Sequence, residues 1–154
     1  MSLSIIMPTY NAVETISRSI KSFIKLDQIS DFNCNLYVVD DFSNDGTLDK
    51  LNEFKNNNNN IFVIKNKKNI GPGLSRNVAL KKIKSGYIGF LDADDEIIPE
   101  SYLEAINGGS KIESDWITFN GWFCNNNLKS EKYDFTRLVD DSGELCKRCM
   151  RGEL

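Results

Sequence analysis

The three carboxylates of Asp92, Asp94 and Asp95 form the group in this sequence that is best suited to carry chemistry. Residues i and i+2 of an extended segment point to the same side, so Asp92 and Asp94 are predicted to converge, and Asp95 can join them if the chain turns. Carboxylates this close repel one another, and a raised pKa or a bound hard cation relieves the repulsion. Oxygen ligands in a chain without histidine favour Mg²⁺ or Mn²⁺, ions that reach a site together with substrate phosphates. The run therefore predicts half of a metal-diphosphate clamp, and the alternative is a solvated turn that caps the next helix.

Polar residues also follow other apolar runs, at Tyr10, Asp40 and Asp41. At least one of the two aspartates should only form a turn toward the next helix, while the other can accept a hydrogen bond from a base or a ribose. Tyr10 can stack on a flat ring or pack against the helix that follows. Arg76 comes after the break at Gly71-Pro72-Gly73, near a helix N-terminus, where it can face a diphosphate or pair with an aspartate. Each of these residues has a binding and a purely structural interpretation.

The elements that must position these residues are short apolar runs that alternate with helical patterns. Strands are predicted at Leu3–Met7, Leu36–Val39, Ile61–Ile64, Tyr87–Leu91 and Trp116–Phe119. Amphipathic helices are predicted after the first four of these runs. The alternation indicates an α/β fold with a parallel sheet flanked by helices. Ligands bind such sheets beyond the carboxyl ends of the strands, and the polar clusters stand at those ends.

Local signals mark the starts of two of these helices. Asn11, with Glu14 three residues later, forms a capping-box pattern, which predicts that the first helix begins there. Thr47, after the turn-rich residues 42–46, is predicted to cap the second helix.

Composition excludes several classes of protein. The chain has 154 residues, enough for one domain, and 19 basic against 22 acidic side chains give a net charge of −3, which argues against a general nucleic-acid binder. The absence of histidine excludes Ser-His and Cys-His catalysis. The N-terminus lacks a basic region, and Pro8 interrupts its apolar stretch, so no signal peptide or membrane helix is predicted and the chain is expected to be cytoplasmic. The cysteines suit reduced thiols, and a zinc site at Cys146 and Cys149 is not favoured because Cys34 and Cys124 are far away in sequence.

Taken together, four segments resemble the nucleotide-binding half of a family 2 glycosyltransferase with the GT-A fold. They are Ser4–Asn11, Val38–Thr47, Asn69–Asn77 and Gly89–Asp95, in the order and at the spacing of that family. The resemblance implies a Rossmann-like three-layer α/β/α sandwich with a mostly parallel central sheet, truncated at the C-terminus. It implies one domain over residues 1–154, with a nucleotide-sugar-binding half at 1–98 and the incomplete start of an acceptor half at 99–154.

The resemblance also implies a role for each candidate residue. Pro8, Thr9 and Tyr10 would line the base and ribose pocket. Asp41 would contact the uracil with support from Asp40, and Arg76 would lie along the nucleotide-sugar site. Asp92 would approach the ribose or the sugar. Asp94 would coordinate the Mn²⁺ or Mg²⁺ ion that bridges the diphosphate, with Asp95 as its substitute.

The implied reaction is the inverting transfer of a sugar, most often from a UDP-sugar, to a hydroxyl of a glycan or lipid-linked acceptor in surface polysaccharide synthesis. The general base is expected beyond Leu154, because no acidic residue after Asp95 stands in a counterpart of the family's base motif. Peripheral association with the inner membrane face and a homo-oligomer formed through an exposed sheet edge are further expectations. The alternatives are a nucleotidyltransferase, which would need a glycine-rich basic loop after the first strand, and a non-catalytic nucleotide-binding or assembly module.

Overall fold

A computed structural model describes the backbone at residues 2–111, 121–124 and 130–133. The chain divides into two compact units, Met1–Leu103 and Glu104–Leu154. The predicted strand at Trp116–Phe119 and the cysteines at 146 and 149 lie outside the described residues. Among the described residues, no helix combines the length and apolar character needed to cross a bilayer.

The first unit contains a four-stranded parallel sheet in the order β3-β2-β1-β4. Its strands are β1 (Ser2–Thr9), β2 (Asn33–Asp40), β3 (Ile61–Lys65) and β4 (Tyr87–Phe90). The predicted parallel α/β fold is confirmed, and all four predicted strands of this unit are present. The register pairs Thr9 with Asp40 and Asp40 with Lys65, so the carboxyl ends of the three strands meet at one edge of the sheet.

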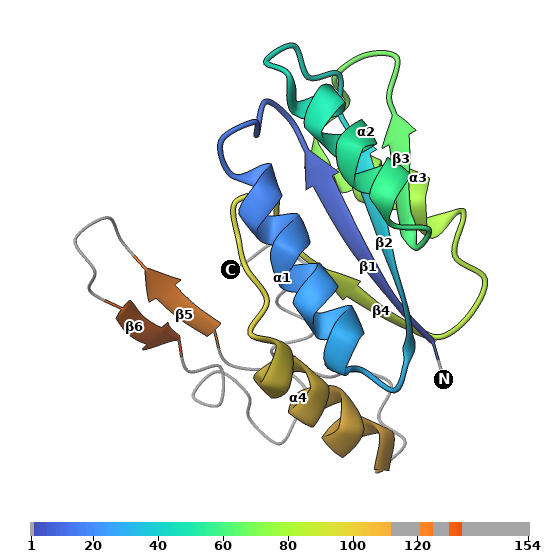
Figure 1. Ribbon diagram of the computed structural model, residues 1–154. Coiled ribbons are helices and arrows are strands. Elements are labelled where there is room, and N and C mark those ends of the chain that lie inside the picture. The colour runs from blue at the N-terminus through green and yellow to red at the C-terminus, as the bar shows by residue number, and fades with distance from the viewer. Residues whose placement is uncertain (1, 112–120, 125–129, 134–154) are drawn as a thin grey trace, which may run out of the picture. The chain divides into compact units, whose positions relative to one another are not determined.

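Helices cover both faces of this sheet, as Figure 1 shows: α1 (Ile16–Ile29) and α2 (Thr47–Asn57) lie on one face and α3 (Pro72–Leu80) on the other. On the α3 side, Ala79 packs with Ile6 and Val39 in a buried cluster. Ile16, Ile20 and Phe23 fall on one side of α1 and are fully buried, as the 3.6-residue period predicts. This arrangement is the three-layer sandwich expected from the sequence.

The second unit contains a two-stranded antiparallel sheet. It pairs β5 (Gly121–Cys124) with β6 (Ser130–Tyr133), with Gly121 opposite Tyr133. Helix α4 (Pro99–Lys111) begins in the first unit, at the proline that the sequence predicts as its start.

Both predicted helix caps are wrong. Helix α1 has Thr15 as its N-cap residue, with no side-chain cap bond, and α2 has Gly46. Asn11 takes a left-handed conformation with φ of 48° and accepts a hydrogen bond from the Asn44 amide, 33 residues away. Thr47 is the first residue of α2, and its hydroxyl accepts a hydrogen bond from the Ala12 amide. The two side chains therefore connect the segment after β1 with the segment between β2 and α2 and with the start of α2, and they do not cap helices.

Gly89 gives the first testable prediction, on stability. A Cβ added at position 89 would overlap the hydroxyl of Tyr102, in the first turn of α4, and lie 2.7 Å from Cδ1 of Ile5. Tyr102 is only 7% exposed, and this burial raises its pKa to about 12. Because overpacking a filled site forces side chains out of their rotamers, Gly89→Ala is expected to lower the free energy of unfolding by about 2 kcal/mol, measured by urea denaturation.

Gly73 provides the matched control for that substitution. A Cβ at Gly73 meets nothing within 4 Å, and the residue lies inside α3 with an ordinary helical conformation. Gly73→Ala is expected to stabilise the protein by roughly 0.5 kcal/mol, because alanine loses less backbone entropy on folding. Equal stabilities for the two variants would contradict the packing assigned to Gly89.

Candidate functional site

A cleft of about 430 Å³ opens where β1 and β4 end and α3 begins, a size typical of small-molecule sites. Five predicted site residues line it together: Pro8, Tyr10, Arg76, Asp92 and Asp94. The other lining residues are Asn11, Ala12, Thr15, Pro72 and Ala93, none of which the sequence analysis assigned to a site. Their short or apolar side chains carry no chemical signal, and only their position beside Tyr10 and Arg76 could have indicated them. The remaining predicted residues, Thr9, Asp40, Asp41 and Asp95, do not line this cleft.

The wall of the cleft that carries Tyr10 is held in place by the loop between β2 and α2. The carboxylate of Asp45 accepts hydrogen bonds from the amides of Val13 and Thr47, each at 3.0 Å, and from the Thr47 hydroxyl at 2.6 Å. Burial of Asp45 acts to raise its pKa, but these hydrogen bonds outweigh it and hold the pKa below its usual range. Lys50 adds a bond to the Val13 carbonyl at 2.6 Å. The loop is therefore fixed by long-range bonds, although it has no regular structure.

Asp41 is buried and anchors the segment that leads into α3. Its carboxylate accepts hydrogen bonds from the Asn66 side chain at 2.8 Å and from the amides of Ile70 and Gly71 at 2.9 and 2.7 Å. Burial acts to raise the pKa of Asp41, and these bonds together lower it below its usual value. The carboxylate is thus engaged inside the protein by residues that precede α3, and it does not form the turn toward the helix at Thr47 that the sequence suggested as the structural alternative. Direct contact between Asp41 and a uracil stays a prediction.

Asp40 and Thr9 form a second buried pair, at the ends of β2 and β1. Asp40 is fully buried and Thr9 is 3% exposed, and the register places them opposite each other. Within the described residues, neither carboxylate oxygen of Asp40 nor the Thr9 hydroxyl has a hydrogen-bond partner. A buried charge without donors is costly, so this pair is the least satisfied polar group near the strand ends.

Arg76 crosses the cleft to an acidic residue on the opposite wall. Its guanidinium forms an ion pair with Asp92 at 2.5 Å and lies 6.0 Å from the centre of the Phe90 ring. The ion-pair alternative for Arg76 is therefore confirmed. The pair places one cation and the two carboxylates of Asp92 and Asp94 on the same small surface.

The four residues Asp92–Asp95, here called the acidic turn, are not extended as the spacing argument assumed. The Asp95 amide bonds to the Asp92 carbonyl at 3.1 Å, which closes a turn. Asp92 and Asp94 nevertheless both line the cleft, so their predicted convergence on one site holds. Burial, followed by the charges of Asp94 and Asp92, raises the pKa of Asp95, while Arg18 lowers it. Negative charge therefore accumulates at this turn.

The residues present fit a hard divalent cation in part. Two carboxylates lining one cleft supply the oxygen donors that Mg²⁺ and Mn²⁺ prefer. Within the described part of the chain, no three acidic, cysteine or histidine side chains gather as a complete metal site. Such an ion would need further oxygens from a ligand or from water, as is usual for Mg²⁺ bound with phosphates.

Comparisons with known proteins agree with this geometry. The family model described as glycosyl transferase family 2 matches residues 4–134. A poly(ribitol-phosphate) beta-glucosyltransferase from Bacillus spizizenii is 37% identical over 116 residues, 75% of this chain and 18% of that protein. The beta-1,3-glucosyltransferase WfgD of Escherichia coli is 34% identical over 150 residues, 94% of this chain and 57% of its own length. The chain thus spans 18% of the length of the first relative and 57% of the length of the second.

A solved structure also resembles the chain in its fold. Staphylococcus aureus TarS, crystallised with UDP-GlcNAc as residues 1–349, superposes with a TM-score of 0.65 and 35% sequence identity, over 75% of this chain and 33% of the TarS chain. The family match covers most of the chain, and the fold and the strand-end cleft agree with it. The chain belongs to glycosyl transferase family 2.

Proposed function

We propose that this chain carries the nucleotide-sugar-binding part of an inverting glycosyltransferase that uses a UDP-sugar and Mn²⁺ or Mg²⁺. The observation that supports it most is the cleft that joins Tyr10, Arg76, Asp92 and Asp94 at the strand ends. An aromatic ring, a guanidinium and two carboxylates are the groups that a base, a diphosphate and its counter-cation require. WfgD is named for UDP-Glc, and TarS was crystallised with UDP-GlcNAc, which favours a UDP donor.

Each residue has a role in this proposal. Tyr10 stacks on the base, and Pro8 and Thr9 shape the base and ribose pocket. Asp41 contacts the uracil and Asp40 supports it, although both side chains are buried. Arg76 leaves its ion pair with Asp92 to neutralise the diphosphate, and Asp92 approaches the ribose or sugar. Asp94 binds the cation, and Asp95 is its substitute.

In the proposed reaction an acceptor hydroxyl oxygen attacks the anomeric carbon from the face opposite the diphosphate. The new carbon–oxygen bond forms as the bond to the diphosphate oxygen breaks, and UDP leaves with the bonding electron pair. When bound, the divalent cation would stabilise the charge that grows on this leaving group. The acceptor's proton passes to a general base. Among the described residues the cleft holds only the carboxylates of Asp92 and Asp94, so we place this base outside them.

The acceptor is proposed to be a hydroxyl of a growing surface glycan, because relatives are named for poly(ribitol-phosphate) and for GlcNAc-diphosphoundecaprenol. Association with a second copy is proposed through β4, an edge strand on which Ile88 and Phe90 are 42% and 52% exposed. A nucleotidyltransferase is not favoured, since the loop after β1 contains neither glycine nor a basic residue.

Isothermal titration of the chain with UDP, with and without Mn²⁺, tests the proposal. We expect binding in both conditions and affinity about tenfold higher with Mn²⁺, a difference of about 1.4 kcal/mol. Parallel titrations with GDP and dTDP identify the base that the pocket prefers. Absence of binding to any of the three nucleotides, with or without metal and from folded protein, would refute the proposal.

A further inference from the structure

We infer that the polar face of α1, formed by Arg18, Ser19 and Ser22, is a positioning surface that holds the acidic turn in the shape needed for metal-assisted nucleotide binding. This inference rests on the proposed function. None of the three residues lines the cleft. They act on the site through the backbone of the residues that do line it.

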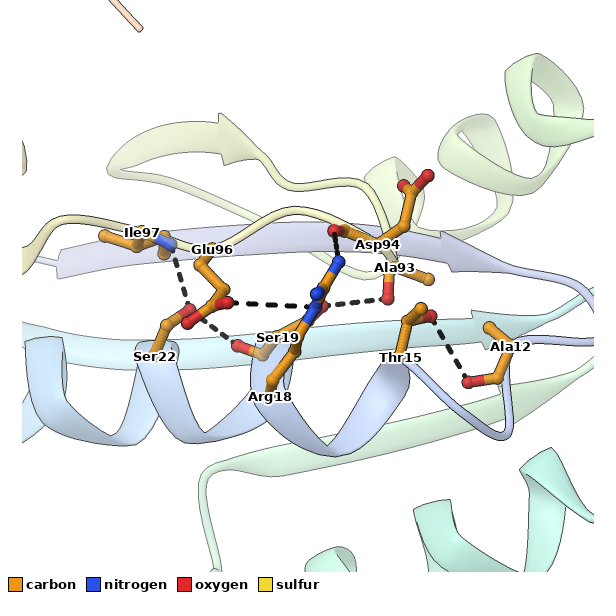
Figure 2. Close-up of polar contacts among 9 residues, drawn as sticks. All are labelled: Ala12, Thr15, Arg18, Ser19, Ser22, Ala93, Asp94, Glu96 and Ile97. Carbon is orange, nitrogen blue, oxygen red and sulfur yellow. Dashed lines mark hydrogen bonds and ion pairs between the residues drawn. The ribbon is translucent and has the colours of Figure 1, made fainter. Parts of the chain in front are cut away.

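Three backbone groups of residues 93–97 form hydrogen bonds with this face, as Figure 2 shows. The Ser19 hydroxyl donates to the Ala93 carbonyl at 2.8 Å, and the Arg18 guanidinium donates to the Asp94 carbonyl at 2.6 Å. The Ser22 hydroxyl accepts the Ile97 amide at 2.9 Å and donates to the Ser19 carbonyl at 2.7 Å. Arg18 also lies 3.7 Å from the Glu96 carboxylate. The segment 93–97 is thus held from its start to its end.

The two serines stand where the helical period calls for apolar residues. Ser19 is fully buried and Ser22 is 4% exposed, on the helix that buries Ile16, Ile20 and Phe23. A buried hydroxyl is tolerated only when it is hydrogen bonded, and the partners outside α1 belong to the segment 93–97. This is a sequence signal for such a contact, because polar residues interrupt an apolar helical face.

The direction of these bonds decides what the face does for the site. In Figure 2 the Asp94 carbonyl oxygen points to Arg18, while the Asp94 carboxylate points away from α1. Fixing the carbonyls of Ala93 and Asp94 therefore leaves the carboxylate of Asp94 directed to the cleft that it lines. Without these bonds the turn is free to rotate its peptide planes, and the carboxylates of Asp92 and Asp94 no longer share one orientation. Residues that orient metal ligands in this way commonly change metal affinity tenfold or more.

The first experiment measures UDP affinity with and without Mn²⁺ in Arg18→Gln and Ser19→Ala. We expect the metal-dependent gain in affinity to fall by about tenfold in each variant, with metal-free UDP affinity within about twofold of wild type. A purely structural role would lower both affinities together or neither. Lys21→Gln and Ser17→Ala are the matched controls, because they remove the same charge and the same hydroxyl from α1 outside this face, and they should keep the full gain.

A second measurement requires no ligand. In Ser22→Ala the Ile97 amide loses its acceptor, so its hydrogen exchange should become faster while the amides of β1 stay protected. Unchanged exchange at Ile97, or a full metal-dependent gain in folded Arg18→Gln and Ser19→Ala, would overturn the inference. Failure of wild type itself to bind UDP would refute the proposed function instead, and the exchange result would still show whether α1 holds the segment.

Discussion

Replacing Asp92 and Asp94 together by asparagine is expected to abolish the additional thermal stabilisation that Mn²⁺ gives to the folded chain in the presence of UDP. A ligand at one hundred times its dissociation constant stabilises the native state by about 2.7 kcal/mol. For a domain of this size that corresponds to a rise in Tm of roughly 5 to 10 °C. Asparagine keeps the shape of each side chain but removes the charge that holds a hard cation, so the metal-dependent part of this shift should disappear. Differential scanning fluorimetry measures it directly.

The double variant should itself remain folded. Asp92 is about half exposed and Asp94 is exposed, and removing two neighbouring negative charges relieves their mutual repulsion. Asp31→Asn combined with Asp49→Asn changes the net charge equally at two exposed aspartates away from the cleft, and this control should keep the full shift. Equal shifts in wild type and in Asp92→Asn/Asp94→Asn would mean that the acidic turn only connects β4 to α4, as a non-catalytic binding module would require.

Periodicity predicted the strand ends well because the burial of a parallel strand is local information. The apolar runs that end at Met7 and Val39 and the run that begins at Tyr87 become β1, β2 and β4, and parallel pairing then brings their carboxyl ends to one edge. The convergence of Pro8, Tyr10 and Asp92 on one cleft follows from that topology, whereas Arg76 reaches it from α3. Asp92 and Asp94 both line this cleft even though Asp92–Asp95 forms a turn and not the extended segment that was assumed.

Hydrogen bonds between segments far apart in the sequence could not be predicted from local patterns. Asn11 and Thr47 carry the side chains of good helix caps, but Asn11 bonds to Asn44 and Thr47 to Ala12, each more than thirty residues away. Local patterns also could not distinguish Asp40 from Asp41, because the two are adjacent residues of the same type. Alternation along β2 buries Asp40, which meets no donor among the residues that the structure describes, while the Asp41 carboxylate accepts hydrogen bonds from the amides of Ile70 and Gly71. Only the folded chain distinguishes the two aspartates.

Asp41→Ala is expected to lower the free energy of unfolding by roughly 3 kcal/mol at neutral pH, because it removes the acceptor of three buried or partly buried donors. These donors are the Asn66 side chain and the amides of Ile70 and Gly71. Their loss also releases the start of α3, the helix that carries Arg76 into the cleft. Urea denaturation at pH 7 measures the effect, with Asp49→Ala, at an exposed position of α2, as the control that should change stability by less than about 1 kcal/mol.

The pH dependence of the same variant shows whether hydrogen bonds to a charged carboxylate are responsible. The folded-state pKa of Asp41 lies below its unfolded value, so its stabilisation is fully present above about pH 4 and is lost as the pH falls through the folded pKa. The difference between wild type and Asp41→Ala should therefore shrink as the pH falls below about 4. If instead Asp41→Ala keeps wild-type stability at pH 7 and loses only UDP affinity, the carboxylate serves the nucleotide directly and its bonds to the Ile70 and Gly71 amides contribute little.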